Sequence, residues 1–122
     1  MTKKSVYETI CKLNKKIITE SEKIKDVCHD TSPYKHAKVD VKAKDESIII
    51  TISKLKKPDK DTTSPCASVV DTITMFEMNY KAEGRKITDI KYDEDFFKKA
   101  KVNVEAKDTS IIITISELKK AD

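Results

Sequence analysis

The chain has 122 residues, of which 38% are charged and 38% hydrophobic, and its formal net charge is +4. This length fits one domain or two very small ones, and no apolar run approaches the ~20 residues that span a bilayer, so we expect no membrane segment. The first residues lack the apolar region of a secretory signal. Cys11, Cys28 and Cys66 are an odd number at irregular spacings, which does not predict a disulfide framework. We therefore expect a cytoplasmic protein in a reducing compartment.

The sequence contains an internal repeat. Residues 5–57 and 68–120 align without a gap at an offset of 63 residues and are identical at about half of the positions. The densest match joins DESIIITISKLKK, which begins at Asp45, to DTSIIITISELKK, which begins at Asp108. A repeat of this kind indicates a duplicated structural unit. We predict a tandem duplication in one fused core, with repeat 1 at residues 1–57, a linker at 58–67 and repeat 2 at 68–122.

Each repeat begins with a predicted helix. Ser5 and Glu8 have the spacing of a capping box, and Ser68 with Asp71 repeats it, although aspartate fits that place less well than glutamate. Apolar residues then recur every three or four positions, which places them on one helical face. This stripe comprises Val6, Ile10, Leu13 and Ile17 in repeat 1, and Val69, Ile73, Phe76 and Tyr80 in repeat 2. We expect the first helix to end around Ser21, with a continuation to Val27 as the alternative, and the second to end at Gly84 as its C-cap.

A short strand and a connector follow each helix. Thr88, Ile90 and Tyr92 alternate with other residues and have good strand propensity, which predicts a strand here and at the matching place in repeat 1. The connectors TSPYKHA and EDFFKKA are long enough for a single helical turn. In the first of them, Ser32 suits the N-cap and Pro33 the first helical position.

The last third of each repeat has the pattern of a β-hairpin. Residues 39–44 alternate between apolar and polar, which predicts a strand with one face in water, whereas residues 48–52 are apolar on both faces. One helix covers only one face of a three-stranded sheet. The face that carries Ile49 and Ile112 therefore needs the other repeat, as a stacked sheet or within one six-stranded sheet. We predict an α+β fold of two α-β-β-β units with pseudo-two-fold symmetry, the helices packing on antiparallel sheet.

No group of residues in the sequence indicates catalysis or a bound cofactor. Cys28, His29 and Asp30 are neighbours, whereas catalytic triads are assembled from residues distant in sequence. The cysteines and histidines lack the paired spacing of a zinc site, and the single glycine excludes the known phosphate-binding and dinucleotide-binding motifs. We therefore expect a non-enzymatic protein that holds neither a metal nor a cofactor.

The basic charge belongs to the first repeat. Residues 1–63 contain 15 lysines and 10 acidic residues, whereas residues 64–122 contain 10 basic and 11 acidic residues. Lysines beside an aromatic side chain suit the phosphates and bases of nucleic acids, although arginine, the preferred reader of bases, occurs only once. Nucleic-acid binding is therefore an alternative function, with Lys12, Lys15, Lys16, Tyr34 and Lys35 as the candidate residues.

The leading hypothesis is a factor that binds a protein partner and modulates or inhibits it. Two lysines on the helix of repeat 1 become methionines in repeat 2, and methionine-rich surfaces adapt well to partners. Two adjacent phenylalanines in the second connector cannot both face one core, which leaves one available as an exposed contact. The predicted contact residues are Met75, Met78, Phe96 and Phe97, on a chain that is a monomer or a homodimer. Small size and a lysine- and isoleucine-rich composition, typical of AT-rich coding sequence, suit an accessory protein of a virus or mobile element, including one that blocks a host defence.

Overall fold

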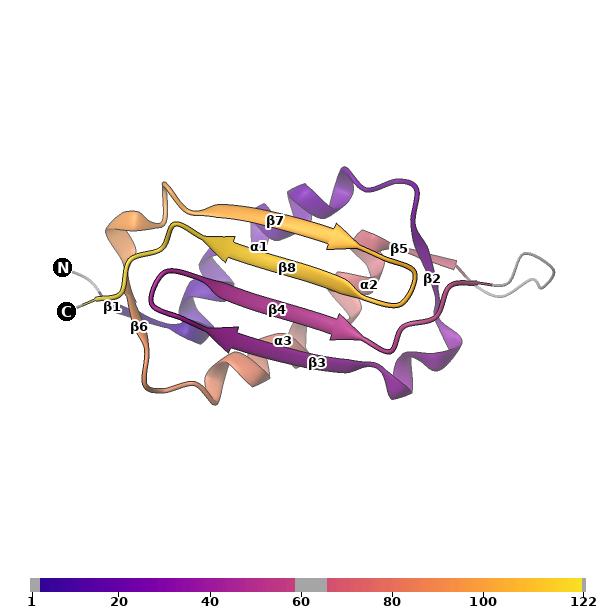
Figure 1. Ribbon diagram of the computed structural model, residues 1–122, viewed down its shortest axis with the longest axis horizontal. Helices are drawn as coiled ribbons and strands as arrows, with labels where there is room; N and C mark the ends of the chain where they lie inside the picture. The colour runs from indigo at the N-terminus through magenta and orange to yellow at the C-terminus, as the bar shows by residue number, and fades with distance from the viewer. Residues whose placement is uncertain (1–2, 59–65, 122) are drawn as a thin grey trace.

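The computed structural model describes residues 3–58 and 66–121, and its centre is a four-stranded antiparallel sheet (Figure 1). The strands, in the spatial order β3-β4-β8-β7, are β3 (Lys38–Ala43), β4 (Ile48–Ser53), β8 (Ile111–Ser116) and β7 (Lys101–Ala106). The helices α1 (Val6–Glu22), α2 (Val69–Met75) and α3 (Glu77–Arg85) all lie behind this sheet. No helix in the described ranges has both the length and the apolar character needed to cross a membrane. The predicted α+β class, with helices packed on antiparallel sheet, is confirmed.

The hairpins of the two repeats meet along β4 and β8, which pair antiparallel with Ile50 opposite Ile113. Because these two residues are 63 positions apart, matching parts of the repeats face each other across a local two-fold axis that passes through the sheet. Rotation about an axis perpendicular to a sheet leaves the helices of both halves on one side of it. The arrangement is the one that a duplication would produce, while the duplication itself stays a prediction from the sequence.

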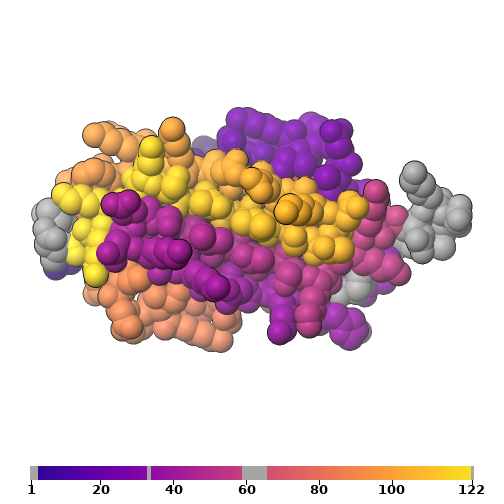
Figure 2. All heavy atoms as spheres, in the orientation of Figure 1, coloured from indigo at the N-terminus to yellow at the C-terminus, as the bar shows by residue number. Residues whose placement is uncertain are grey.

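No helix or strand of residues 3–58 and 66–121 covers the other face of the central sheet, which corrects the expectation that the second repeat would bury it. Figure 2 shows this face with no helix over it. Ile49 and Ile112 lie here half-buried, and their neighbours along the strands are threonine and serine. The predicted alternatives of stacked sheets and one six-stranded sheet are both wrong. An antiparallel sheet can leave one face in water, and the remaining strands of this chain pair elsewhere.

Those remaining strands form two short ribbons, each of which joins the two repeats. β1 (Lys3–Ser5) pairs with β6 (Lys91–Asp93), and β2 (Cys28–Asp30) pairs with β5 (Cys66–Ser68). A short strand follows each helix as predicted, but β6 begins at Lys91, so Thr88 and Ile90 precede it and only Tyr92 of the predicted alternation lies within it. The strands before the helices, β1 and β5, were not predicted, and β5 includes the end of the predicted linker, residues 58–67. Each repeat thus depends on the other for a strand partner.

The predicted helical faces form the core. All eight residues of the two apolar stripes are buried, together with the inward-facing isoleucines of β4 and β8. Ser5 caps α1 with both hydrogen bonds of the capping box, and α1 ends at Glu22, one residue after Ser21. The Ser68 hydroxyl accepts a hydrogen bond from the main-chain N–H of Asp71 at 3.1 Å. The single helical turns predicted in the connectors are the 3₁₀ helices η1 (Ser32–His36) and η2 (Glu94–Phe96), although the N-cap of η1 is Thr31.

The second helix differs from its prediction in two ways. It is interrupted at Phe76, where the backbone (φ −96°, ψ 7°) ends α2 and begins α3. Gly84 is not the C-cap, because it lies inside α3 and is buried against α1. A Cβ atom on Gly84 would lie only 3.0 Å from Cδ1 of Ile10. The glycine therefore allows α1 and α3 to pack closely, and it does not terminate a helix.

In each ribbon, a buried polar side chain from one repeat forms a hydrogen bond to the hairpin turn of the other repeat. Nε2 of His29 lies 2.9 Å from the main-chain oxygen of Lys107 and donates to it, since a carbonyl oxygen only accepts. At the matching place in repeat 2, the Tyr92 hydroxyl donates to the main-chain oxygens of Lys44 and Ser47. Burial of the hydroxyl raises the pKa of Tyr92 to about 12. These bonds hold the ends of the sheet and the ribbons in one core.

We predict that the two faces of β8 respond differently to truncation. Ile113→Ala removes a fully buried side chain and should lower the free energy of unfolding by ~3 kcal/mol, because it leaves a cavity. The control, Ile112→Ala, lies on the uncovered face and should cost about 1 kcal/mol or less. Urea unfolding followed by circular dichroism measures both values, and equal losses would contradict the assignment of the open face.

A second prediction concerns alkaline pH. The pKa of tyrosine is ~10 in the unfolded chain, whereas burial raises the pKa of Tyr92 in the folded protein to about 12. The stability due to this burial is therefore complete below pH ~10 and is lost as the pH rises toward 12. Tyr92→Phe should reduce stability at pH 7 but should also reduce the further loss between pH 9 and 11. Urea unfolding at these three pH values tests this, and an unchanged alkaline loss in the variant would contradict it.

Candidate functional site

The stretch Cys28-His29-Asp30 has structural contacts at all three side chains. Cys28 is bonded to Cys66, and the buried His29 ring donates to the Lys107 carbonyl. The Asp30 carboxylate accepts hydrogen bonds from the Ser32 N–H at 2.9 Å and from the Ser32 hydroxyl, and these bonds lower the pKa of Asp30. The stretch therefore stabilises the β2–β5 ribbon and the start of η1. Within residues 3–58 and 66–121, no three histidine, cysteine or acidic side chains form a group that could hold a metal ion.

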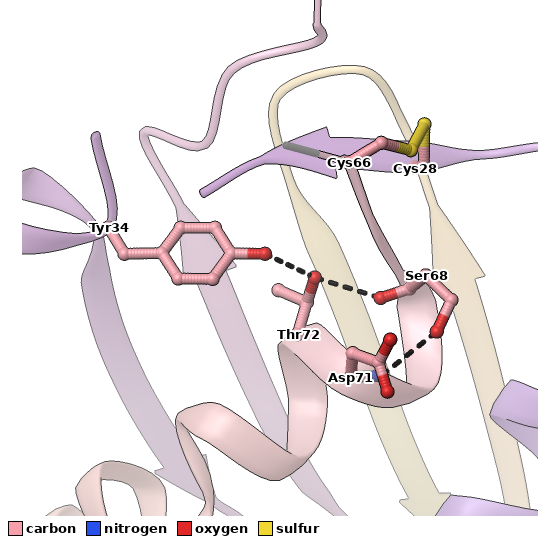
Figure 3. Close-up of a disulfide and its surroundings, with 6 residues drawn as sticks. All are labelled: Cys28, Tyr34, Cys66, Ser68, Asp71 and Thr72. Carbon is pink, nitrogen blue, oxygen red and sulfur yellow. Dashed lines mark hydrogen bonds between the residues drawn. A yellow bond between two sulfur atoms is a disulfide. The ribbon is translucent and has the colours of Figure 1, made fainter. Parts of the chain in front are cut away.

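The disulfide between Cys28 and Cys66 corrects the prediction that the cysteines form none (Figure 3). Their Cα atoms are 5.7 Å apart on paired strands, and the bond joins the two repeats, while Cys11 is free. This pairing depends on β5, which the sequence pattern did not reveal, so the spacing of the cysteines gave no sign of it. The cytoplasmic location stays a prediction, and it loses the support of unpaired cysteines because disulfides persist mainly in oxidising compartments.

The first candidate surface surrounds the two exposed methionines. Among the described residues, Met75 and Met78 are the large hydrophobic side chains that stand in solvent, with 59% and 81% of their surface exposed. Met78 also borders a shallow pocket of about 290 Å³ on α3 and the start of α1. The guanidinium of Arg85 lies 4.1 Å from the centre of the Tyr7 ring there. We call this the methionine surface; it consists of Met75, Met78, Tyr7, Lys81, Ala82 and Arg85.

The two phenylalanines predicted as contacts do not join the methionine surface. Phe97 is only 8% exposed and belongs to the core, so its assignment as a contact residue is wrong. Phe96 is half-buried, with the ammonium groups of Lys99 and Lys119 at 5.8 and 5.1 Å from its ring centre. The turn that carries both rings packs on α1, where the Lys16 ammonium donates to the Phe97 carbonyl at 3.4 Å. The methionines lie instead on α2 and α3.

The second candidate surface is a groove between α1 and the edge strand β7. It measures about 600 Å³, and the residues that line it are Lys12, Lys15, Lys16, Thr19, Glu20, Ala100 and Val102. A hollow of about 450 Å³ shares two of these lysines and adds Leu13, Glu94, Phe97 and Lys98. We call the two together the basic groove. The structure thus brings Lys12, Lys15 and Lys16 to one place, as the alternative function required.

The other two candidates for nucleic-acid binding lie elsewhere. Tyr34 packs against Phe76 of the second helix, with ring centres 5.3 Å apart. Figure 3 shows its hydroxyl beside that of Thr72, at 2.8 Å. Burial raises the pKa of the Tyr34 hydroxyl. Lys35 follows it in η1 and is exposed. Since η1 packs on the second helix and η2 on the first, the predicted aromatic partner is absent from the basic groove.

No protein-family model, curated protein or solved structure matches this chain. Its function is therefore inferred from the surfaces themselves.

We predict that the disulfide contributes to stability although the matching ribbon has none. Lys3 and Lys91 stand at the equivalent places of β1 and β6, so the pairing does not require the bond. Reduction should nevertheless lower the free energy of unfolding by about 2–4 kcal/mol, because it frees the unfolded chain. Urea unfolding with and without dithiothreitol measures this. The Cys66→Ser variant is the control, since the reductant should not change it, and a native protein insensitive to dithiothreitol would contradict the prediction.

Proposed function

We propose that this chain is a non-enzymatic interaction factor that binds a partner protein through the methionine surface and thereby modulates or inhibits the partner. The observation that carries the proposal is the exposure of two large apolar side chains three residues apart, Met75 at the end of α2 and Met78 near the start of α3. Burying a methionine side chain in an interface contributes ~1.5–3 kcal/mol, so two of them can anchor a contact. Lys81 and Arg85 give this apolar centre a polar rim, as in protein interfaces.

The fold offers no reason to keep methionine at these two places. Lys12 and Lys15 occupy the matching positions on α1, and α1 packs on the same sheet. The scaffold therefore accepts a charged side chain where repeat 2 has an exposed apolar one. Methionine is flexible and polarisable, so it suits a surface that adjusts to a partner. This comparison within one chain supports a binding role for the methionines over a structural one.

The roles of the potentially reactive residues support the non-enzymatic part of the proposal. Cys28 is in the disulfide, His29 is buried with a carbonyl partner, and Asp30 is occupied by Ser32. A nucleophile and a base would have to be accessible to a substrate and within reach of each other. The side chains of Cys28, His29 and Asp30 are instead used in the contacts that stabilise the β2–β5 ribbon.

Nucleic-acid binding is the second candidate function, and the gathering of three lysines in the basic groove favours it. Lysines that contact phosphates release counterions, so such binding weakens steeply as salt rises. The lining of the groove argues against nucleic-acid binding. Phe97 is the aromatic residue that lines it, and this side chain is buried and offers no face on which a base could stack. We therefore place this function behind protein binding.

We predict that Met75→Glu combined with Met78→Glu abolishes capture of the partner from a lysate of the source cells, because two charges would replace the apolar centre of the contact. The control combines Thr74→Glu with Asn79→Glu, two exposed residues on the same helices, and should capture as the native chain does. Captured proteins are compared by mass spectrometry, with and without nuclease treatment. Equal capture by both variants would contradict the methionine surface, and loss of all captured material after nuclease would favour the second function.

A further inference from the structure

The edge strand β7 has backbone groups that point away from the sheet. Among the described residues, β7 pairs only with β8, and the Lys107 N–H donates to the Ser110 carbonyl at the turn between them. Hydrogen-bonded pairs alternate along an antiparallel ladder. Counting back from this turn, Glu105 and Asn103 bond to β8, whereas Val104 and Val102 direct their N–H and C=O groups outward. This side of β7 is therefore available to another strand.

The basic groove lies directly beside this free edge. Val102 and Ala100 form the β7 side of the groove, and lysines of α1 form the opposite wall. The Lys16 ammonium reaches across to the Ala100 carbonyl at 3.3 Å, which shows that an α1 side chain can contact the outward groups of the edge. A groove between an edge strand and a helix is the setting in which extended peptides add a strand to a sheet, with main-chain hydrogen bonds to the edge and side chains in the groove.

Charge indicates which peptides would fit. Four lysines line the basic groove, namely Lys12, Lys15, Lys16 and Lys98, against two carboxylates. Both carboxylates are already paired, Glu20 with Lys23 at 2.7 Å and Glu94 with Lys12 at 3.3 Å. Within residues 3–58 and 66–121, Lys15 forms no ion pair. A peptide strand beside β7 would direct every second side chain toward these ammonium groups. Acidic side chains at alternate positions would therefore complement the groove.

Two other occupants fit the groove less well. A nucleic acid would use the lysines, but it would leave the outward N–H and C=O groups of Val102 and Val104 without partners. It would also lie against the apolar side chains of Ala100 and Val102 on the β7 side of the groove. A second copy of the chain, paired through its own β7, would bring two sets of groove lysines together, and like charges at close range repel. The acidic peptide alone satisfies the backbone edge and the charge at once.

We infer that the β7 edge and the basic groove bind an extended acidic segment of a partner protein as an additional strand of the central sheet. This inference rests on the proposed function, because the segment belongs to a protein partner, but it concerns a different surface from the methionines. The opposite edge strand, β3, pairs only with β4 within the described ranges. The helix positions that match Lys12, Lys15 and Lys16 are there Met75, Met78 and Asn79, so the selectivity for acidic peptides belongs to the β7 edge.

The test uses the full chain and three synthetic probes in fluorescence anisotropy. The first probe is an eight-residue peptide of alternating glutamate and valine with a fluorescent label. In the second probe lysine replaces glutamate, and in the third alternate main-chain nitrogens are methylated, so that they cannot donate to a strand. We expect only the first to bind, and we expect its binding to weaken at least fivefold between 50 and 300 mM salt.

Two charge-matched variants locate the binding. Lys15→Glu should weaken the binding of the glutamate peptide roughly tenfold, because it places a like charge in the groove. Lys35→Glu makes the same change in net charge on an exposed residue of η1 and should bind like the native chain. Amide hydrogen exchange gives a second readout: the peptide should protect the N–H groups of Val102 and Val104, which are free, and leave those of Asn103 and Glu105 unchanged.

The possible results separate this inference from the proposed function. Binding that weakens about tenfold in Lys15→Glu and protects Val102 and Val104 supports strand addition, and the double glutamate variant of the methionines should retain it. No binding, or equal binding of the N-methylated peptide, overturns the inference and leaves the methionine surface untouched. Preferential binding of a labelled oligothymidylate, or sedimentation as a dimer that the peptide does not dissociate, overturns it in favour of a nucleic acid or a second copy.

Discussion

The antiparallel pairing of β4 with β8 is the interaction on which the rest of the structure depends. It joins the two hairpins into one sheet, with Ile50 opposite Ile113, and it sets the local two-fold axis. From that axis follow the placement of all helices on one face and the exposure of the other face. The two ribbons then become possible, because the axis brings the start of each repeat beside the middle of the other. Neither repeat can complete its own strands alone.

On this shared scaffold the two repeats differ where they meet solvent. The side chains facing the core are alike, since isoleucines of β4 and β8 and the stripes of the helices fill both halves. The outer surfaces diverge: α1 has lysines where α2 and α3 have methionines, and one ribbon carries a disulfide that the other lacks. Packing constrains buried positions much more than exposed ones. A fold of this kind can therefore present two unlike binding surfaces without a change in its core.

The features predicted correctly from the sequence are those that produce a periodic pattern of apolar and polar residues. The helix faces, the capping box at Ser5 and the hairpins are correct, because each produces a pattern within a few neighbouring residues. Features that depend on distant pairing were missed: the three-residue strands β1 and β5 carry no pattern, and the Cys28–Cys66 bond depends on β5. The sequence predicts Gly84 as a helix C-cap, whereas its actual role is to make room for the side chain of Ile10 on α1. For the candidate sites, residue type was enough to identify Met75 and Met78 as exposed. The burial of Phe97 and the distance of Tyr34 from the basic groove could be predicted only from the tertiary packing.

The pairing of β4 with β8 should make the two repeats one cooperative unit. Native-state amide hydrogen exchange in low concentrations of urea tests it most directly, because it reports the free energy of opening for each strand separately. We expect the most protected amides of β4 and β8, including those of Ile50 and Ile113, to open with the same free energy, equal to that of global unfolding. Exchange from one repeat at a clearly lower free energy, while the other stays protected, would contradict it.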